Sequence, residues 1–108
     1  MVTYGSVLDS LADPTRRDIL ELVRRKPSSV REIADQLPIS RPAVSQHLKI
    51  LKDAGVVVSR PVGTRRVYTV TTDGFEVLRQ WLDTMWRDAL SDFAWFVDTQ
   101  PNESGVQS

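Results

Sequence analysis

The residues of this sequence best suited to bind another molecule lie in the stretch SRPAVSQHLKILKD, residues 40–53. At about 100° per residue, a helix here places Val44, Leu48 and Leu51 on one apolar face. The opposite face carries side chains that suit DNA, because arginine pairs with guanine, glutamine with adenine and lysine with phosphate. The predicted DNA-binding residues of this helix are Ser40, Arg41, Pro42, Ser45, Gln46 and Lys49. The alternative is an ordinary solvated face, which usually alternates acids with bases; here the first acid is Asp53.

A second group of basic residues lies in a predicted β-hairpin, in which VVVSR and RRVYTVT flank the turn PVGT. Guanidinium groups this close together repel one another unless a phosphate or a narrow minor groove receives them. We therefore predict that the hairpin contacts DNA through Arg60, Thr64, Arg65 and Arg66. The alternative explanation is that charges on an edge hairpin guard against aggregation.

Catalytic and metal-binding chemistry finds little support in the sequence. His47 is the single histidine, and it falls beside Leu48 and Leu51, where a hydrogen-bonded structural imidazole is more common than a catalyst. Without cysteine, one histidine makes a poor metal site. The carboxylates of the last helix accompany Arg79 and Arg87, so solvated ion pairs explain them. We predict no enzyme activity, no catalytic residues, no metal and no cofactor.

The composition is typical of a one-domain globular protein, since the 108 residues are 41% hydrophobic and 26% charged. No long apolar run, signal pattern or cysteine is present, which predicts a cytoplasmic protein with no membrane partner. The formal net charge is zero, but residues 14–70 hold twelve Lys or Arg against five acids, whereas residues 71–108 hold two against seven. This segregation of charge predicts a polyanion-binding face beside a separate acidic surface. The alternative is that the distribution of surface charge has no functional meaning.

Four or five helices and the hairpin account for most of the chain. A first helix is expected over residues 4–12, and Asp13 and Pro14 suit the N-cap and first turn of a second. A capping box formed by Ser29 and Glu32 opens a third helix. Only two residues separate its end from the N-cap of the 40–54 helix, so these two helices must cross at a large angle. That crossing is the geometry of a helix-turn-helix.

A long last helix, expected from Asp73 to Val97, carries all three tryptophans and more apolar residues than one small core can cover. Burying one large side chain stabilises by about 1.5–3 kcal/mol, so leaving several in water is costly. We predict a homodimer, with the first helix alongside. A pocket for a small-molecule effector of unknown identity, lined by the same aromatic residues, is a compatible alternative. The predicted dimerisation residues are Tyr4, Leu8, Leu11, Leu78, Trp81, Leu82, Met85, Trp86, Leu90 and Phe93.

The predicted fold class is mainly α with a small β-hairpin, a winged helix-turn-helix whose first and last helices form a dimer interface. Residues 1–97 would form this DNA-binding and dimerisation domain, and residues 98–108 a disordered tail. A two-fold dimer places two recognition helices about 34 Å apart in successive major grooves of double-stranded DNA, which predicts an inverted-repeat site. The rival hypothesis is a winged-helix protein-interaction module, which would need an apolar or mixed-charge face on the 40–54 helix.

Several of these motifs resemble the ArsR/SmtB family of bacterial winged helix-turn-helix regulators. The resemblance rests on LADPTRR at 11–17, SRPAVSQHLKIL at 40–51, AGVV at 54–57 and GTRRVY at 63–68. It implies a homodimer that binds a palindromic operator, usually as a repressor released by a signal. The family's best-known members sense metals through cysteines in the third helix or His, Asp and Glu sets in the last. The third helix here reads SSVREIADQL and the last has no histidine, so neither metal site is carried over.

Overall fold

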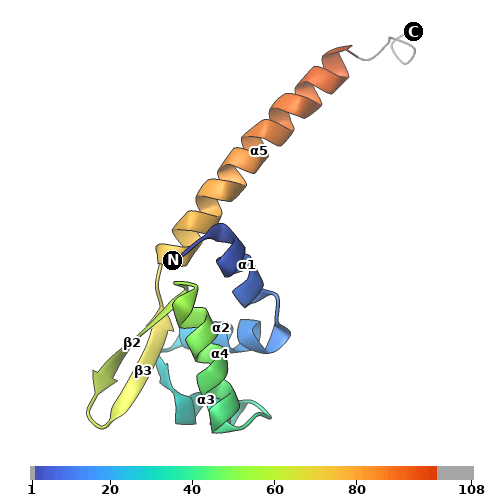
Figure 1. The fold of residues 1–108 in the computed structure, drawn as a ribbon. Helices are drawn as coiled ribbons and strands as arrows, with labels where there is room; N and C mark the ends of the chain where they lie inside the picture. The colour runs from blue at the N-terminus through green and yellow to red at the C-terminus, as the bar shows by residue number, and fades with distance from the viewer. Residues whose placement is uncertain (1, 100–108) are drawn as a thin grey trace.

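The computed structural model describes residues 2–99 and folds them into helices around a small antiparallel sheet (Figure 1). In Figure 1, helices α1 to α4 and the sheet form the body of the domain, and α5 projects away from it. The predicted class, mainly helical with a β-hairpin, is confirmed. The elements are α1 (Tyr4–Leu11), α2 (Pro14–Arg25), β1 (Ser28–Ser29), α3 (Val30–Gln36), α4 (Arg41–Asp53), β2 (Val57–Val62), β3 (Arg65–Val70) and α5 (Asp73–Thr99).

The hydrophobic core lies where the helices of the body meet the first residues of β2. Three of its members belong to α4, which confirms the predicted apolar face of that helix. Phe75 and Leu78 pack against the same core, so the first turns of α5 are part of the body. The fully buried members of the core are Val7, Ile19, Val23, Ile33, Val44, Leu48, Leu51, Val56 and Val57.

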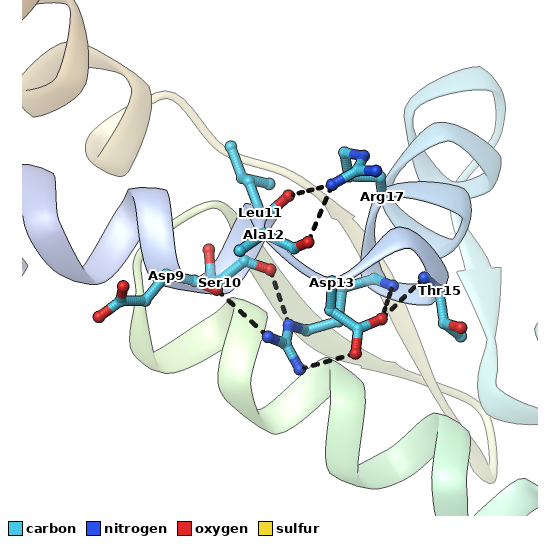
Figure 2. A network of polar contacts seen from close by, with 8 residues as sticks. Asp9, Ser10, Leu11, Ala12, Asp13, Thr15 and Arg17 are labelled. Carbon is cyan, nitrogen blue, oxygen red and sulfur yellow. Dashed lines mark hydrogen bonds and ion pairs between the residues drawn. The ribbon is translucent and has the colours of Figure 1, made fainter.

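The LADPTRR motif holds the turn between α1 and α2 (Figure 2). The Asp13 carboxylate caps α2 by accepting two backbone N–H groups of its first turn, at 2.7 and 3.2 Å. Arg16 Nε donates to the carbonyl of Ser10 at 2.7 Å, and Arg17 Nη1 donates to the carbonyl of Leu11 at 2.8 Å. The end of a helix leaves its last carbonyls without partners in the helix. The two arginines supply those partners, so the motif joins one helix to the next.

The hydrogen bonds that Asp13 accepts at the start of α2 make the stability of the fold depend on pH. The backbone N–H of Arg16, followed by that of Thr15 and by the Arg16 guanidinium, holds the pKa of Asp13 below its ordinary value of 3.8. A carboxyl whose pKa is lowered by folding stabilises the protein above its unfolded-state pKa, and this contribution is lost as pH falls through the folded-state value. We expect melting temperature to fall below about pH 4. Asparagine still caps a helix but does not titrate, so the melting temperature of Asp13→Asn should fall less between pH 7 and pH 3 than that of the wild type. Equal falls in the two proteins would contradict this role of Asp13.

The sheet has three strands, whereas the sequence predicted only a two-stranded hairpin. The strand order is β1-β3-β2, and β1 pairs antiparallel with β3, with Ser28 opposite Tyr68 and Ser29 opposite Val67. Two serines before a helix give no strand signal, since neither β-branched residues nor alternation is present. The missed strand matters because it lays the start of α3 beside β3.

The turn of the hairpin is shorter than predicted. Pro61 and Val62 belong to β2, and Val62 pairs with Arg65, so the loop contains only Gly63 and Thr64. Gly63 has a φ of 63°, which a two-residue hairpin loop requires at its first position and which glycine adopts at little cost. The tight loop makes the β2–β3 hairpin, which we call the wing, a regular ribbon up to its tip.

Helix α4 ends in a Schellman motif. The N–H of Val56 donates to the carbonyl of Leu51 at 3.1 Å, and that of Gly55 donates to the carbonyl of Lys52 at 3.0 Å. Gly55 has a φ of 77°, so the predicted left-handed glycine after the 40–54 helix is confirmed. The motif fixes where the chain leaves α4 for β2.

Helix α5 leaves the body after its second turn. The ring of Trp81 stacks on Tyr4 of α1, with centroids 4.7 Å apart and planes 8° from parallel. From Leu82 to Thr99, every residue is exposed. None of the helices in residues 2–99 combines the length and apolar character that a membrane span needs.

The C-terminal boundary differs from the prediction by two residues. Helix α5 ends at Thr99 rather than Val97, so positions 98 and 99, which were assigned to the tail, are helical. The remaining part of the predicted tail, residues 100–108, lies outside the described residues.

Candidate nucleic-acid interface

Helix α4 buries one side and presents the other to solvent. Ser40 is its N-cap, with a hydroxyl that accepts from the N–H of Ala43 at 3.3 Å. Because Val44, Leu48 and Leu51 are buried, the helix cannot turn its polar side inward. The outward side therefore consists of polar and basic side chains. All six predicted residues are exposed: Ser40, Arg41, Pro42, Ser45, Gln46 and Lys49.

Lys49 is paired within its own helix. Its Nζ lies 2.9 Å from Oδ2 of Asp53, and the two side chains are 75% and 66% exposed. Exposed ion pairs of this kind contribute about 0–1 kcal/mol, so a phosphate can displace the carboxylate. The Lys49 ammonium is therefore accessible to an anion from solvent.

The four predicted wing residues, Arg60, Thr64, Arg65 and Arg66, are exposed as well. Two of the arginines already have partners in the chain: Arg66 Nη1 donates to Oγ of Ser59 at 3.0 Å, and Arg65 Nη1 lies 3.5 Å from Oε1 of Glu32. The predicted repulsion between the arginines is therefore partly relieved without DNA. The sequence reasoning missed this because it did not place α3 beside the wing.

A groove of about 410 Å³ runs between the wing and the first turns of α3 and α4. Four arginines from three elements border it, and we call it the arginine groove. Arg31, at the start of α3, was not among the predicted DNA-binding residues. Only the pairing of β1 with β3 would have placed Arg31 beside the wing, and the sequence did not reveal that pairing. The lining residues are Ser29, Val30, Arg31, Arg41, Thr64, Arg65 and Arg66.

His47 is half-buried on the inner side of α4, as predicted. The predicted hydrogen bonding is wrong for one nitrogen, because its buried Nδ1 has no partner among residues 2–99. Asp13 is near enough for the charges of the two groups to interact, but no hydrogen bond joins them. The same residues contain no group of three or more His, Cys, Asp or Glu that could hold a metal ion.

The predicted dimerisation residues fall into two sets. Tyr4 and Trp81 stack on each other, and Leu11 and Leu78 pack against the core, so these four brace α1 and α5 within one chain. The others contribute large apolar surface to solvent, with exposures from 41% for Leu8 to 65% for Phe93. This second set is Leu8, Leu82, Met85, Trp86, Leu90 and Phe93.

A short turn between α3 and α4, an exposed polar face on α4 and an arginine-bearing ribbon together define a winged helix-turn-helix DNA-binding domain. The chain belongs to the ArsR family of bacterial regulatory proteins, whose family model matches residues 13–59. The HTH-type transcriptional regulator Rv2034 of Mycobacterium tuberculosis is 47% identical over 107 residues, which cover 96% of this chain and 100% of that protein. The match extends well beyond the helix-turn-helix.

Two further relatives agree with this assignment. The transcriptional repressor SdpR of Bacillus subtilis is 34% identical over 72% of this chain and 87% of its own length. The solved structure of an ArsR-like transcriptional regulator from Rhodococcus sp. RHA1 superposes with a TM-score of 0.75 at 28% identity, covering 90% of this chain and 92% of that one. The protein is thus a DNA-binding transcriptional regulator and not an enzyme, as the sequence predicted.

Proposed function

We propose that the protein is a homodimeric repressor that binds an inverted-repeat operator, with α4 in the major groove and the wing on the neighbouring backbone. The observation that carries the proposal is that Arg41, in the first turn of α4, borders the same groove as Arg65 and Arg66 of the wing, while the other predicted residues of α4 are exposed. A helix of this size fits the major groove of B-DNA, and arginines beside it can reach phosphates or the minor groove. That the relative SdpR is named a repressor supports the direction of regulation.

The exposed half of α5 supports a dimer. Between Leu82 and Thr99 every residue is exposed in the described part of the chain, although the stretch includes two tryptophans and two phenylalanines. In proteins, most of the stability of a helix comes from the packing of an apolar face rather than from intrinsic propensity. A second copy of α5 would provide that packing. Two-fold symmetry would then set two copies of α4 about 34 Å apart, matching half-sites one helical turn from each other.

Gln46 and Arg66 are expected to contribute differently to binding. Gln46→Ala should relax the preference for one base pair, which is worth about 1–3 kcal/mol of discrimination for a good bidentate contact. Arg66→Ala should weaken binding to all sequences and reduce the slope of log affinity against log salt by about 0.9. Sequencing of the genomic fragments that the protein retains would identify the operator, and fluorescence anisotropy against operator and random duplexes would measure both effects.

A matched control is Gln80→Ala, because Gln80 is an exposed glutamine on α5, far along the chain from the proposed interface. This variant is expected to bind like the wild type. If Gln46→Ala and Arg66→Ala also left operator affinity unchanged, the assignment of α4 and the wing to DNA would be wrong. A winged-helix module that docks a protein would show no steep salt-dependent binding to any duplex.

A further inference from the structure

Glu32 connects the wing to the helix-turn-helix. Because Ser29 pairs with Val67, the first turn of α3 lies beside the strand residue Arg65. The Glu32 Oε1 accepts from the N–H of Ser29 at 2.9 Å, which closes the capping box of α3. The same oxygen lies 3.5 Å from Nη1 of Arg65. One carboxylate therefore caps a helix and holds a wing arginine.

All the charged residues that line the arginine groove are arginines, and Glu32 lies next to the groove through its ion pair with Arg65. Arg31 comes from α3, Arg41 from α4, and Arg65 and Arg66 from β3, and all four residues are exposed. Four guanidinium groups around one open groove favour an anion with several acceptor oxygens, and guanidinium groups bind phosphate in bidentate fashion. The place of the groove, between the wing and the N-terminal end of α4, is where the DNA backbone would pass in the proposed complex.

We propose that the arginine groove holds one backbone phosphate of DNA and that Glu32 is its internal competitor, so that Arg65 exchanges the Glu32 carboxylate for phosphate on binding. This inference rests on the proposed function. Arg65 and Glu32 are 52% and 37% exposed, so their ion pair is weak enough to break. In the free protein Glu32 is paired with Arg65, and on binding the phosphate has to displace this carboxylate from Arg65. Glu32 thereby limits the affinity of the regulator for any DNA.

Glu32 stays charged at neutral pH. Its pKa is held below the ordinary value of 4.5, first by the backbone N–H of Ser29, then by the Ser29 hydroxyl, and less by the charges of Arg65 and Lys26. The competition with phosphate is therefore a permanent feature of the protein under physiological conditions. Removing it requires a substitution at Glu32.

Glu32→Gln tests the proposal because it removes the charge and keeps the fold. Glutamine also completes a capping box, so α3 retains its start. By anisotropy at constant salt, the variant is expected to bind random duplex and genomic operator fragments about threefold to fivefold more tightly, because Arg65 no longer has to leave the Glu32 carboxylate before it binds phosphate. The matched control is Glu76→Gln, which makes the same change of charge on α5, where Glu76 pairs with Arg79 at 3.5 Å. The control is expected to change affinity by less than about twofold.

A double-mutant cycle separates exchange at Arg65 from simple repulsion. If Glu32 acts through Arg65, the gain from Glu32→Gln should shrink to less than about twofold in an Arg65→Gln background. A full gain in that background would overturn the exchange. Arg31→Gln, by contrast, is expected to weaken binding to all duplexes and reduce the salt slope by about 0.9, as the loss of one phosphate contact requires. An unchanged slope would overturn the assignment of Arg31 to the phosphate.

The source of the phosphate is tested by adding inorganic phosphate in place of chloride at equal ionic strength. We expect no extra release of DNA, because a single free anion lacks the remaining contacts of the duplex. Release at millimolar phosphate would make the groove a site for free anions and would overturn the proposal. Wild-type protein that binds no duplex would refute the proposed function itself, whereas wild-type binding that Glu32→Gln leaves unchanged would refute only the role of Glu32.

Discussion

Trp86→Glu is expected to turn the dimer into a monomer and to reduce affinity for a two-half-site operator by about 100-fold or more. Trp86 is 65% exposed in the single chain and lies on the side of α5 that carries Leu82, Leu90 and Phe93. In a two-fold interface each substitution occurs twice, so the dimer would have to bury two carboxylates in an apolar contact. Losing a central tryptophan alone costs about 2 kcal/mol or more in such an interface.

Trp95→Glu is the matched control for this variant. Trp95 is 67% exposed, nearly the same as Trp86, and also belongs to the free half of α5. The two tryptophans are nine residues apart, which at about 100° per residue puts them on opposite sides of the helix. Trp95→Glu is therefore expected to stay dimeric and to bind DNA like the wild type.

Light scattering after size exclusion would give the mass of each variant, and anisotropy against full and half operators would give affinity. Since Trp86 is exposed and is not among the residues that pack against the core, the monomer should still melt cooperatively. A Trp86→Glu protein that remained dimeric, or a Trp95→Glu protein that became monomeric, would show that the partner covers a different side of α5.

The sequence was sufficient to predict the helices, because their starts and ends depend on neighbouring residues. Asp13, Ser29 and Ser40 cap the helices they were expected to cap, and Gly55 ends α4. The buried side of α4 followed from its 3.6-residue period alone. These features are local, so a single sequence contains them.

What the sequence did not reveal depends on contacts between distant residues. The strand of Ser28 and Ser29 exists only because β3 lies beside it, and without that pairing neither the Glu32–Arg65 ion pair nor the place of Arg31 can be inferred. The exposed polar side of α4 was thus predictable in outline, whereas the arginine groove was not. Long-range pairing sets the second half of the candidate interface.

Gly74 is a second feature that only the tertiary structure explains. In the sequence it is a glycine in the first turn of a helix, where it weakens the helix slightly. In the structure Gly74 is buried, and its N–H donates to the carbonyl of Gly55 at 2.7 Å. A Cβ at this position would lie 2.6 Å from the carbonyl oxygen of Ala54 and 3.0 Å from that of Gly55. The start of α5 is thus in direct backbone contact with the end of α4.

Gly74→Ala is accordingly expected to destabilise the protein by about 3 kcal/mol, because the atoms it meets are backbone and cannot move aside as a side chain can. For a domain of this size that corresponds to a fall in melting temperature of about 12–24 °C. The control is Gly5→Ala in α1, where the nearest atom to a Cβ is Thr3 Oγ1 at 3.9 Å and the helix should gain about 0.5–1 kcal/mol.

Urea unfolding of both glycine variants would measure these changes directly. If Gly74→Ala lowered the free energy of unfolding by less than about 1 kcal/mol, α5 would be able to shift away from α4 at little cost. In the proposed complex the position would also matter for binding, since it joins the proposed dimerisation helix to the end of α4. If a Gly74→Ala protein still folds at low temperature, any shift of α5 would change the spacing of the two α4 helices. It should therefore lose affinity for the full operator while keeping its affinity for a single half-site.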